Sequence, residues 1–251
     1  MKVGIFTATR WEYAAIRRVL DDRRRHGHGG LRCSAGRRGN HDVVLVQTGI
    51  GPEQAAAACR EAVRAHRVEL VVSSGLAGAL ASARVGDLLV GSDVRSETDE
   101  RMRWSCAGTL ADAALRTAER AGMPAHRGSF VTVPRMVWQA SDKQALAERT
   151  GAIGVDMESA ALAGVAAEQG IPFVVFRHVS DLRDENMPVN FNLFMRPADW
   201  MKGVAACVAN PSCVMGLLRL RAQMKTATDA MSRFFAQWLD ELASPVGNGR
   251  S

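Results

Sequence analysis

The sequence contains no long uncharged apolar run. It has 251 residues, 47% of them hydrophobic, but Arg, Asp, Glu or Gly interrupts every apolar stretch before it reaches the ~18 residues of a membrane-spanning helix. The short apolar run at residues 3–8 soon reaches the polar Arg10, without the longer hydrophobic region or the cleavage site of a signal peptide. We therefore expect a single globular domain over residues 1–251, located in the cytoplasm.

Cysteine pairs and nucleotide-binding loops are also missing. The five cysteines, at positions 33, 59, 106, 207 and 213, lie far apart, with no Cys-x-x-Cys pair and no His at zinc spacing. Two glycine turns, residues 48–52 and 74–78, lack the spacing of a dinucleotide fingerprint or a P-loop. The sequence thus predicts no disulfide framework, no metal and no cofactor.

Positive charge is in excess, and the excess is local. The net charge is +6 and the pI is about 9.5, which can indicate an acidic partner such as nucleic acid or an anionic membrane surface. Eight arginines fall within residues 17–38, a glycine-containing stretch that we interpret as a mobile surface connection with solvated charge; anion binding is the alternative. No binding motif or interleaved aromatic pattern accompanies the charge, so we expect no nucleic-acid partner.

Short apolar runs alternate with helical stretches, which indicates an α/β fold with a sheet covered on both faces. We predict a three-layer α/β/α domain around a central mixed, mostly parallel twisted sheet. The expected strands are residues 2–8, 42–48, 69–74, 87–92, 152–155 and 173–179. The expected helices are residues 12–21, 52–66, 110–121, 157–169 and 215–242.

The C-terminal segment, residues 212–242, is amphipathic and basic. Leucines at 217, 218 and 220 alternate with arginines at 219 and 221, and aromatic residues follow at 234, 235 and 238. Packing against the sheet or against a second subunit is the simplest role for such a helix. A lid or a peripheral membrane contact is the alternative.

Three carboxylates stand where a predicted strand ends or the next helix starts: Glu12, Glu158 and Asp181. Ligands of α/β sheets bind outside the carboxyl ends of the strands, and glycine turns let the backbone approach them closely. These residues are therefore candidates for catalysis. Capping of a helix N-terminus is the structural alternative for such carboxylates.

These motifs, in this order, resemble methylthioadenosine/adenosylhomocysteine nucleosidases of the nucleoside phosphorylase/nucleosidase superfamily over about residues 1–185. The resemblance implies a nucleoside phosphorylase-like fold, an enzyme that releases adenine from an adenosine-type nucleoside, and a homodimer. It rests on the first strand with Glu12, on Thr48-Gly49-Ile50-Gly51, Gly75-x-Ala77-Gly78, Val85-Gly86-Asp87, Val155-Asp156-Met157-Glu158 and Val179-Ser180-Asp181.

The resemblance also implies residue roles. Asp181 would protonate N7 of the purine, as a general acid for the leaving group. Glu12, with help from Arg177, would position and deprotonate the attacking water. Glu158 would bind the ribose hydroxyls and stabilise an oxocarbenium-like sugar, and Met157 would pack against the ribose. The remaining substrate contacts that the resemblance implies are Ala77, Gly78, Met136, Val137 and Ser180.

The second glycine turn departs from the superfamily pattern. Phosphorylases place an Arg and a Ser of their phosphate pocket where this sequence has Ser73 and Leu76. Because phosphate needs charge-assisted contacts, we predict water as the nucleophile, so the enzyme is a hydrolase. Phosphorolysis stays open as the alternative, since arginines of residues 17–38 could contribute. Leu76 also replaces a Ser that nucleosidases use near the water.

The C-terminal part is similar to hopanoid-associated members of the superfamily, which act on adenosylhopane. That likeness lies in Asn210-Pro211 and the leucines and arginines of residues 217–221, and the segment after Asp93 lacks the aromatics that surround the 5′ end of methylthioadenosine. Our sharper hypothesis is adenosylhopane cleavage in hopanoid biosynthesis, by an enzyme in peripheral contact with a membrane through residues 212–242. Methylthioadenosine/adenosylhomocysteine cleavage and a non-enzymatic nucleoside-binding module are the alternatives.

Overall fold

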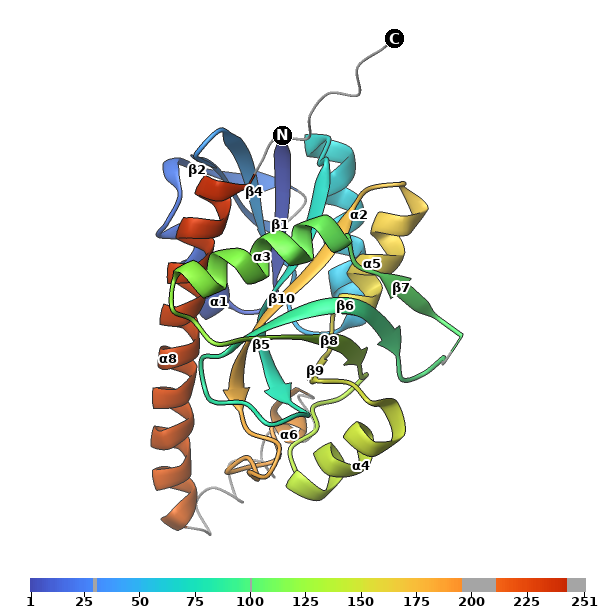
Figure 1. Ribbon diagram of the computed structural model, residues 1–251, viewed down its shortest axis with the longest axis vertical. Helices are drawn as coiled ribbons and strands as arrows, with labels where there is room; N and C mark the ends of the chain where they lie inside the picture. The colour runs from blue at the N-terminus through green and yellow to red at the C-terminus, as the bar shows by residue number, and fades with distance from the viewer. Residues whose placement is uncertain (29–30, 100, 196–210, 243–251) are drawn as a thin grey trace.

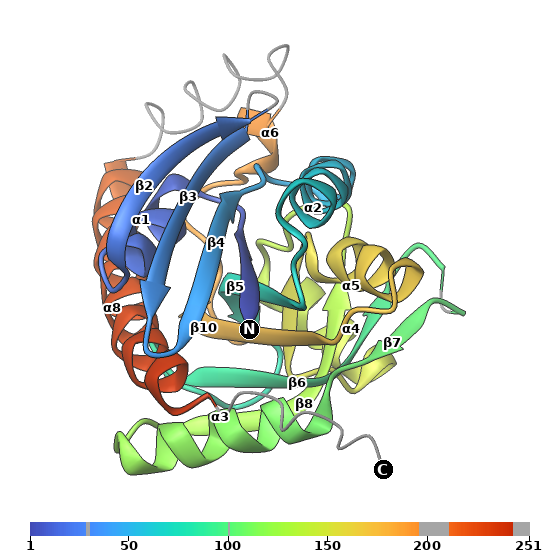
Figure 2. The ribbon, with the colours of Figure 1, turned by 90° about the horizontal axis from the view of Figure 1, so that it is seen from above.

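The computed structural model describes residues 1–28, 31–99, 101–195 and 211–242. In this part of the chain a mixed sheet is flanked by helices on both faces (Figures 1 and 2). Its strands are β1 (Lys2–Thr7), β2 (Asp21–His28), β3 (Leu31–Arg38), β4 (His41–Gln47), β5 (Leu70–Ala79), β6 (Leu88–Ser96), β7 (Arg103–Ser105), β8 (Ala125–Thr132), β9 (Gly154–Asp156) and β10 (Phe173–Asp181). The helices are α1 (Arg10–Arg17), α2 (Pro52–His66), α3 (Gly108–Arg120), α4 (Ala140–Thr150), α5 (Ser159–Glu168), α6 (Asn192–Met195) and α8 (Pro211–Glu241).

The centre of the sheet is parallel. β1 lies between β4 and β5, and β10 runs parallel to β5 on its other side. Antiparallel pairings join β3 to β4, β6 to β10 and β9 to β5. Because β4, β1, β5 and β10 point the same way, their carboxyl ends meet at one edge, where ligands of α/β sheets bind. The predicted α/β fold class with a mixed sheet is confirmed.

The expectation of a mobile connection at residues 17–38 is wrong. β2 and β3 form an antiparallel hairpin that extends the sheet beyond β4. Cys33, Ser34 and Gly36 of β3 are buried, whereas Arg32 and Arg37 are exposed. Arginines and glycines hide this burial pattern in the sequence, since both residue types are common in loops. The exposed arginines agree with solvated charge.

Helix α8 covers one face of the sheet together with α1 and α3, whereas α2 and α5 lie on the opposite face (Figure 2). Phe234 and Trp238 are fully buried and contact the ring of Phe176 edge-on, at centroid distances of 5.2 and 4.8 Å. Packing against the sheet is thus confirmed for the buried face of this half of the helix. Val214, Met215 and Leu218 of its first turns are exposed.

None of the helices in the described ranges is long and apolar enough to cross a membrane. Asn210, where the hopanoid-associated likeness begins, lies outside the described residues.

Candidate active site

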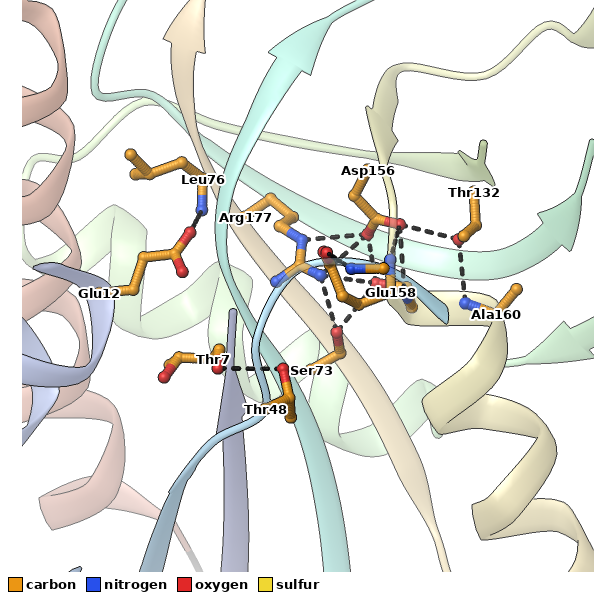
Figure 3. A network of polar contacts seen from close by, with 12 residues as sticks. Thr7, Glu12, Thr48, Ser73, Leu76, Thr132, Asp156, Glu158, Ala160 and Arg177 are labelled. Carbon is orange, nitrogen blue, oxygen red and sulfur yellow. Dashed lines mark hydrogen bonds and ion pairs between the residues drawn. The ribbon is translucent and has the colours of Figure 1, made fainter. Parts of the chain in front are cut away.

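All three predicted carboxylates are buried at the carboxyl edge of the sheet. The exposed fractions of Glu12, Glu158 and Asp181 are 4%, 8% and 6%. Glu158 lies against the glycine turn after β4, and the other two carboxylates lie against Gly75 and Gly78. The prediction of a second turn at residues 74–78 is wrong, because these residues continue β5 and pair with β10. The first glycine turn, the end of β5 and the carboxylates therefore form one acidic site, part of which is shown in Figure 3.

The side chain of Glu12 fits both interpretations of this residue, helix capping and a place in the site. Its Oε2 accepts hydrogen bonds from the main-chain N–H and the hydroxyl of Thr9, which caps α1 in a capping box. Its Oε1 accepts a 2.8 Å hydrogen bond from the N–H of Leu76. A carboxylate offers about four lone-pair positions. Three donors leave room for one more, which a water molecule can fill.

Gly75 separates Glu12 from Arg177. A Cβ atom at Gly75 would lie 2.6 Å from Oε1 of Glu12 and 3.0 Å from a terminal nitrogen of Arg177. The first of these contacts is shorter than real Cβ atoms show, so any other residue at this position would force the Glu12 carboxylate to move. Gly75, which was predicted in a turn and lies in β5, thus makes room for the carboxylate and the guanidinium.

The guanidinium of Arg177 is committed to structural partners. Its Nε donates to Asp156 at 3.0 Å, and Nη2 donates to the hydroxyls of Ser73 and Ser159 at 2.9 and 3.0 Å (Figure 3). Arg177 and Asp156 are both buried, and a buried ion pair persists only when hydrogen bonds satisfy its remaining groups. The help that Arg177 is predicted to give Glu12 therefore rests on its other terminal nitrogen, which faces Gly75.

Asp156 is a site residue that the sequence analysis left without a role. Its carboxylate accepts hydrogen bonds from the hydroxyl of Thr132, the main-chain N–H groups of Glu158 and Ser159, and Arg177. It therefore fixes the turn between β9 and α5 that carries Glu158. Its place in the Val155-Asp156-Met157-Glu158 motif was the available signal.

Glu158 is held by the first glycine turn. Its Oε1 accepts a 2.9 Å hydrogen bond from the N–H of Gly51. Burial, and next the negative charge of Asp156, raise the pKa of Glu158 to about 7, although Arg177 and the Gly51 hydrogen bond act in the opposite direction and Glu12 raises it slightly further. This carboxyl group therefore changes its charge near neutral pH.

Asp181 lies at the end of β10, between Gly78 of β5 and a lysine that was not predicted. Its Oδ1 accepts a 2.8 Å hydrogen bond from the Ser180 hydroxyl, and its Oδ2 accepts a 2.5 Å hydrogen bond from Nζ of Lys143. A Cβ atom at Gly78 would lie 3.0 Å from Oδ2. Lys143 was missed because α4 was not predicted. The available signal was a lysine three residues before the buried Leu146 on one helix face.

The residues expected at the base and ribose share an apolar cluster. Met157 belongs to this cluster, and Met136 and Val137 pack against it. The side-chain amide of Asn192, on α6, donates to the carbonyl of Met136 and accepts from its N–H, both at 2.9 Å. Among the described residues no partner is found for the main-chain N–H and C=O of Val137. Ala77 is buried and its carbonyl accepts from Ser180.

A cavity of about 630 Å³ opens beside Asp181. It lies between residues 81–83, residues 181–188 and the part of α8 around Gln223. Glu12 and Glu158 do not line it, so this space adjoins the acid and not the sugar side of the site. The described residues contain no cluster of three or more His, Cys, Asp or Glu side chains suited to a metal ion.

These features define an α/β protein with a buried acidic site lined by a glycine turn and by the glycines at the end of β5. Residues 2–206 match the protein family described as the Phosphorylase superfamily. The chain belongs to this family.

Individual relatives support the same assignment. A 5′-methylthioadenosine/S-adenosylhomocysteine nucleosidase of Haemophilus influenzae is 28% identical over 212 residues, which are 78% of this chain and 92% of the relative. The fold is similar to that of the Neisseria meningitidis nucleosidase of the same name in complex with methylthio-immucillin-A, with a TM-score of 0.77, 22% identity, and 96% and 99% of the two chains covered. The Helicobacter pylori futalosine hydrolase has the same TM-score at 20% identity, with 96% and 98% covered.

Proposed function

We propose that this protein is a purine nucleosidase, which hydrolyses the N-glycosidic bond of an adenosine-type nucleoside and releases adenine. The observation that carries the proposal is the convergence of Asp181, Glu158 and Glu12, all buried, on the glycine turn after β4 and the end of β5, at the carboxyl edge of the sheet. The names of the relatives from Haemophilus influenzae and Neisseria meningitidis support this reaction class.

Asp181 is the proposed general acid. Breaking the bond between C1′ and N9 leaves negative charge on the purine, and a proton placed on N7 neutralises it. Oδ1 of Asp181 accepts only the Ser180 hydroxyl among the described residues, so this oxygen has a lone pair left for a proton shared with N7. Ser180 and Gly78 shape the space around the acid.

Glu158 is the proposed ligand of the ribose hydroxyls. As the bond breaks, the sugar becomes oxocarbenium-like and positively charged, and a desolvated carboxylate stabilises that charge more strongly than water does. Oε1 is taken by Gly51, and no donor among the described residues contacts Oε2, so that oxygen can accept from a substrate hydroxyl. Met157, which follows Asp156 in the same turn, would pack on the ribose.

Glu12 is the proposed base for an attacking water. The guanidinium of Arg177 already has Asp156, Ser73 and Ser159 as partners, and Glu12 is a second negative charge beside it. A phosphate dianion would meet this carboxylate without an uncommitted cation in the described part of the site, which favours water over phosphate. Phosphorolysis is the alternative reaction.

Val137 is the proposed reader of the base. Adenine carries a hydrogen-bond acceptor at N1 beside a donor at N6. One N–H and one C=O from a single residue complement this pair, and those of Val137 are free of partners in the described residues. The apolar cluster around Met136 and Met157 would cover the faces of the base and sugar.

The test is product analysis with purified protein. Adenine and a free ribose derivative are expected from 5′-methylthioadenosine, with or without phosphate; a ribose 1-phosphate would instead establish phosphorolysis. Asp181→Asn should reduce turnover at least ~100-fold, the usual effect of losing a general acid. Asp184→Asn, a change of the same kind in the exposed part of the next loop, should leave turnover nearly unchanged.

The 5′ substituent of the substrate is the finer part of the proposal. We favour a large apolar group, as in adenosylhopane, because exposed Trp11 and Ile50 adjoin Glu12 and Gly51 in sequence, and Val214, Met215 and Leu218 are exposed on α8. A peripheral membrane contact by these first turns and a homodimer remain predictions. Preferred turnover of methylthioadenosine over adenosylhopane would overturn this substrate choice and support the methylthioadenosine nucleosidase alternative.

A further inference from the structure

A second pocket lies apart from the acidic site, between the end of β6, the strand β7 and the end of α4. Its volume is about 240 Å³, and its lining includes Arg95, Arg103 and Arg149 but none of the three carboxylates of the acidic site. One water molecule takes up ~30 Å³ in the liquid, so the pocket has room for an ion of the size of phosphate. The pocket is small, basic and separate from the proposed reaction.

The sheet register brings two of these arginines together. Arg95 of β6 lies opposite Arg103 of β7 on one side and opposite Val131 of β8 on the other. Side chains of directly opposed residues lie close together on one face of a sheet, and like charges in such positions are destabilising. Val131 is fully buried and belongs to the apolar cluster that contains Met157, so it offers no partner to either guanidinium group. An anion between the two arginines would relieve this repulsion.

Two of the three arginines already have a carboxylate partner. Nε of Arg103 donates to Asp93 at 2.8 Å, and Nη2 of Arg149 donates to Glu97 at 2.6 Å. Arg149 also lies in the last turn of α4, where a cation offsets the helix dipole. These two ion pairs leave the third arginine of the pocket without a counter-charge.

Arg95 is that uncommitted arginine. Its side chain makes no hydrogen bond or ion pair with any residue of the described ranges, and its Nε is buried without a partner. A guanidinium group has five N–H donors and is always charged in proteins. A buried donor without an acceptor destabilises the fold, so the arrangement around Arg95 is incomplete without an acceptor from outside the described residues.

We propose that this pocket binds a small oxyanion of the phosphate class, with Arg95 as its central ligand. The planar fork of a guanidinium group matches two oxygens of such an ion and binds them through charge-assisted hydrogen bonds. Arg103 and Arg149 flank Arg95 and use only one nitrogen each for their carboxylates among the described residues, so both have further donors for the ion. The bound ion neutralises the excess positive charge and joins the β6–β7 hairpin to α4. It is a ligand and is not consumed.

The same chemistry could come from a different source, a carboxylate side chain of a second copy of this chain. Arg95→Gln removes the charge and the fork, whereas Arg95→Lys retains the charge without the fork. Arg64→Gln is the matched control, because Arg64 is an exposed arginine of α2 that pairs with Glu61 outside the pocket. Circular dichroism checks that each variant is folded.

The first measurement is isothermal titration calorimetry with sodium phosphate, with sodium chloride holding the ionic strength constant. Wild type should bind about one phosphate per chain. Arg95→Gln should weaken the affinity at least ~10-fold, as the loss of charge-assisted hydrogen bonds implies. Arg95→Lys should fall between the two, and Arg64→Gln should bind as wild type does. No binding by wild type, or equal binding by wild type and Arg95→Gln, would overturn the proposal.

The second measurement is sedimentation velocity, which separates the two sources of the anion. Arg95→Gln should have the same oligomeric state as wild type. A wild type that binds no phosphate and forms a dimer that Arg95→Gln dissociates would overturn the free ion and assign the pocket to a carboxylate of the second copy.

The third measurement is adenine release from 5′-methylthioadenosine, which separates this site from the proposed function. Arg95→Gln should release adenine as fast as wild type does, because Arg95 lies outside the acidic site. A large loss of release in this variant, with its fold intact, would overturn the separation of the two sites. A wild type that binds phosphate through Arg95 but releases no adenine would sink the nucleosidase and support the phosphate site.

Discussion

Oε1 of Glu158 accepts a hydrogen bond from the main-chain N–H of Gly51, at 2.9 Å. This contact joins the turn after β4 to the start of α5, two segments that are more than a hundred residues apart in sequence. It places a buried carboxylate whose pKa is raised to about 7, mainly by burial and by the charge of Asp156. The residue proposed to bind the ribose is therefore also the one that responds to pH near neutrality.

Activity should depend on the ionisation of Glu158. Its carboxylate form is the one that can stabilise a cationic sugar, so kcat/KM should fall below about pH 7 and approach a tenfold loss per pH unit. The profile of kcat/KM reports groups of the free enzyme. Glu158→Gln should abolish this fall of kcat/KM at acid pH, together with most of the activity. Glu168→Gln, on the exposed surface of α5, should retain the fall of kcat/KM at acid pH. A flat wild-type profile between pH 5 and pH 8, about two units below and one above the pKa of Glu158, would contradict the assignment.

Gly75→Ala should damage catalysis more than folding. The new Cβ atom would lie 2.6 Å from Oε1 of Glu12, so the carboxylate must move. Misplacement of a catalytic group by about 1 Å can cost up to ~100-fold in rate, whereas overpacking typically costs about 1–3 kcal/mol of stability. We expect kcat at least ~10-fold lower with a cooperative urea unfolding transition. Gly164→Ala, whose Cβ meets Trp104 at an ordinary 3.5 Å, is the control, and equal activity of the two variants would argue against Glu12 as the base.

Asn192→Ala should weaken substrate binding more than turnover. The amide of Asn192 makes two hydrogen bonds to the main chain of Met136, next to Val137, which is the proposed reader of adenine. Losing both hydrogen bonds should destabilise the ordered conformation of that segment by about 1–3 kcal/mol. We expect KM to rise about tenfold, which corresponds to about 1.4 kcal/mol in the lower half of that range, with a smaller change in kcat. Gln144→Ala, which removes an amide contact to the exposed Asp184, should leave KM unchanged.

The sequence indicated where the carboxylates would gather, because strand ends in an α/β sheet meet at one edge. Glu12, Glu158 and Asp181 could be predicted from that rule and from the motifs around them. Lys143 could not be predicted, because it contacts a residue 38 positions away in sequence and because α4, which carries it, has only a weak apolar face. Arg177 was predicted to help Glu12, but its strongest partner is Asp156, a preference decided by packing in the folded core.

Composition misled the prediction at β3 for a related reason. Cys33, Ser34 and Gly36 are buried between exposed arginines, and this small, polar inner face carries little of the apolar alternation that marks a strand. The neighbouring β4 supplies the missing information, because its main-chain groups pair with β3 along seven register positions. Such pairing energy belongs to two strands together and cannot be read from either alone.

His178 should make the folded state sensitive to acid. Its ring is fully buried beside Phe234, neither ring nitrogen has a partner within the described residues, and burial, with a contribution from Arg233, lowers its pKa to about 3. Between pH 6.5 and about 3 the unfolded chain binds a proton at this residue that the folded chain does not. The free energy of unfolding should therefore fall as pH drops through this window, with a contribution of up to about 1.4 kcal/mol per pH unit.

Replacing His178 isolates that contribution. His178→Leu removes the titrating group and two buried polar atoms, so urea unfolding should show a shallower loss of stability below pH 6.5 and no large loss at pH 7. The half-exposed His126, which pairs with Asp87, is the control, and His126→Gln should retain the wild-type acid slope, the loss of unfolding free energy per pH unit below pH 6.5.

Because Glu158 binds an extra proton in the folded state between about pH 4.5 and 7, it stabilises the fold as pH falls and partly offsets His178. The acid slope of Glu158→Gln should thus be steeper than wild type, and that of His178→Leu shallower; slopes that both match wild type would show that neither group titrates as its burial requires.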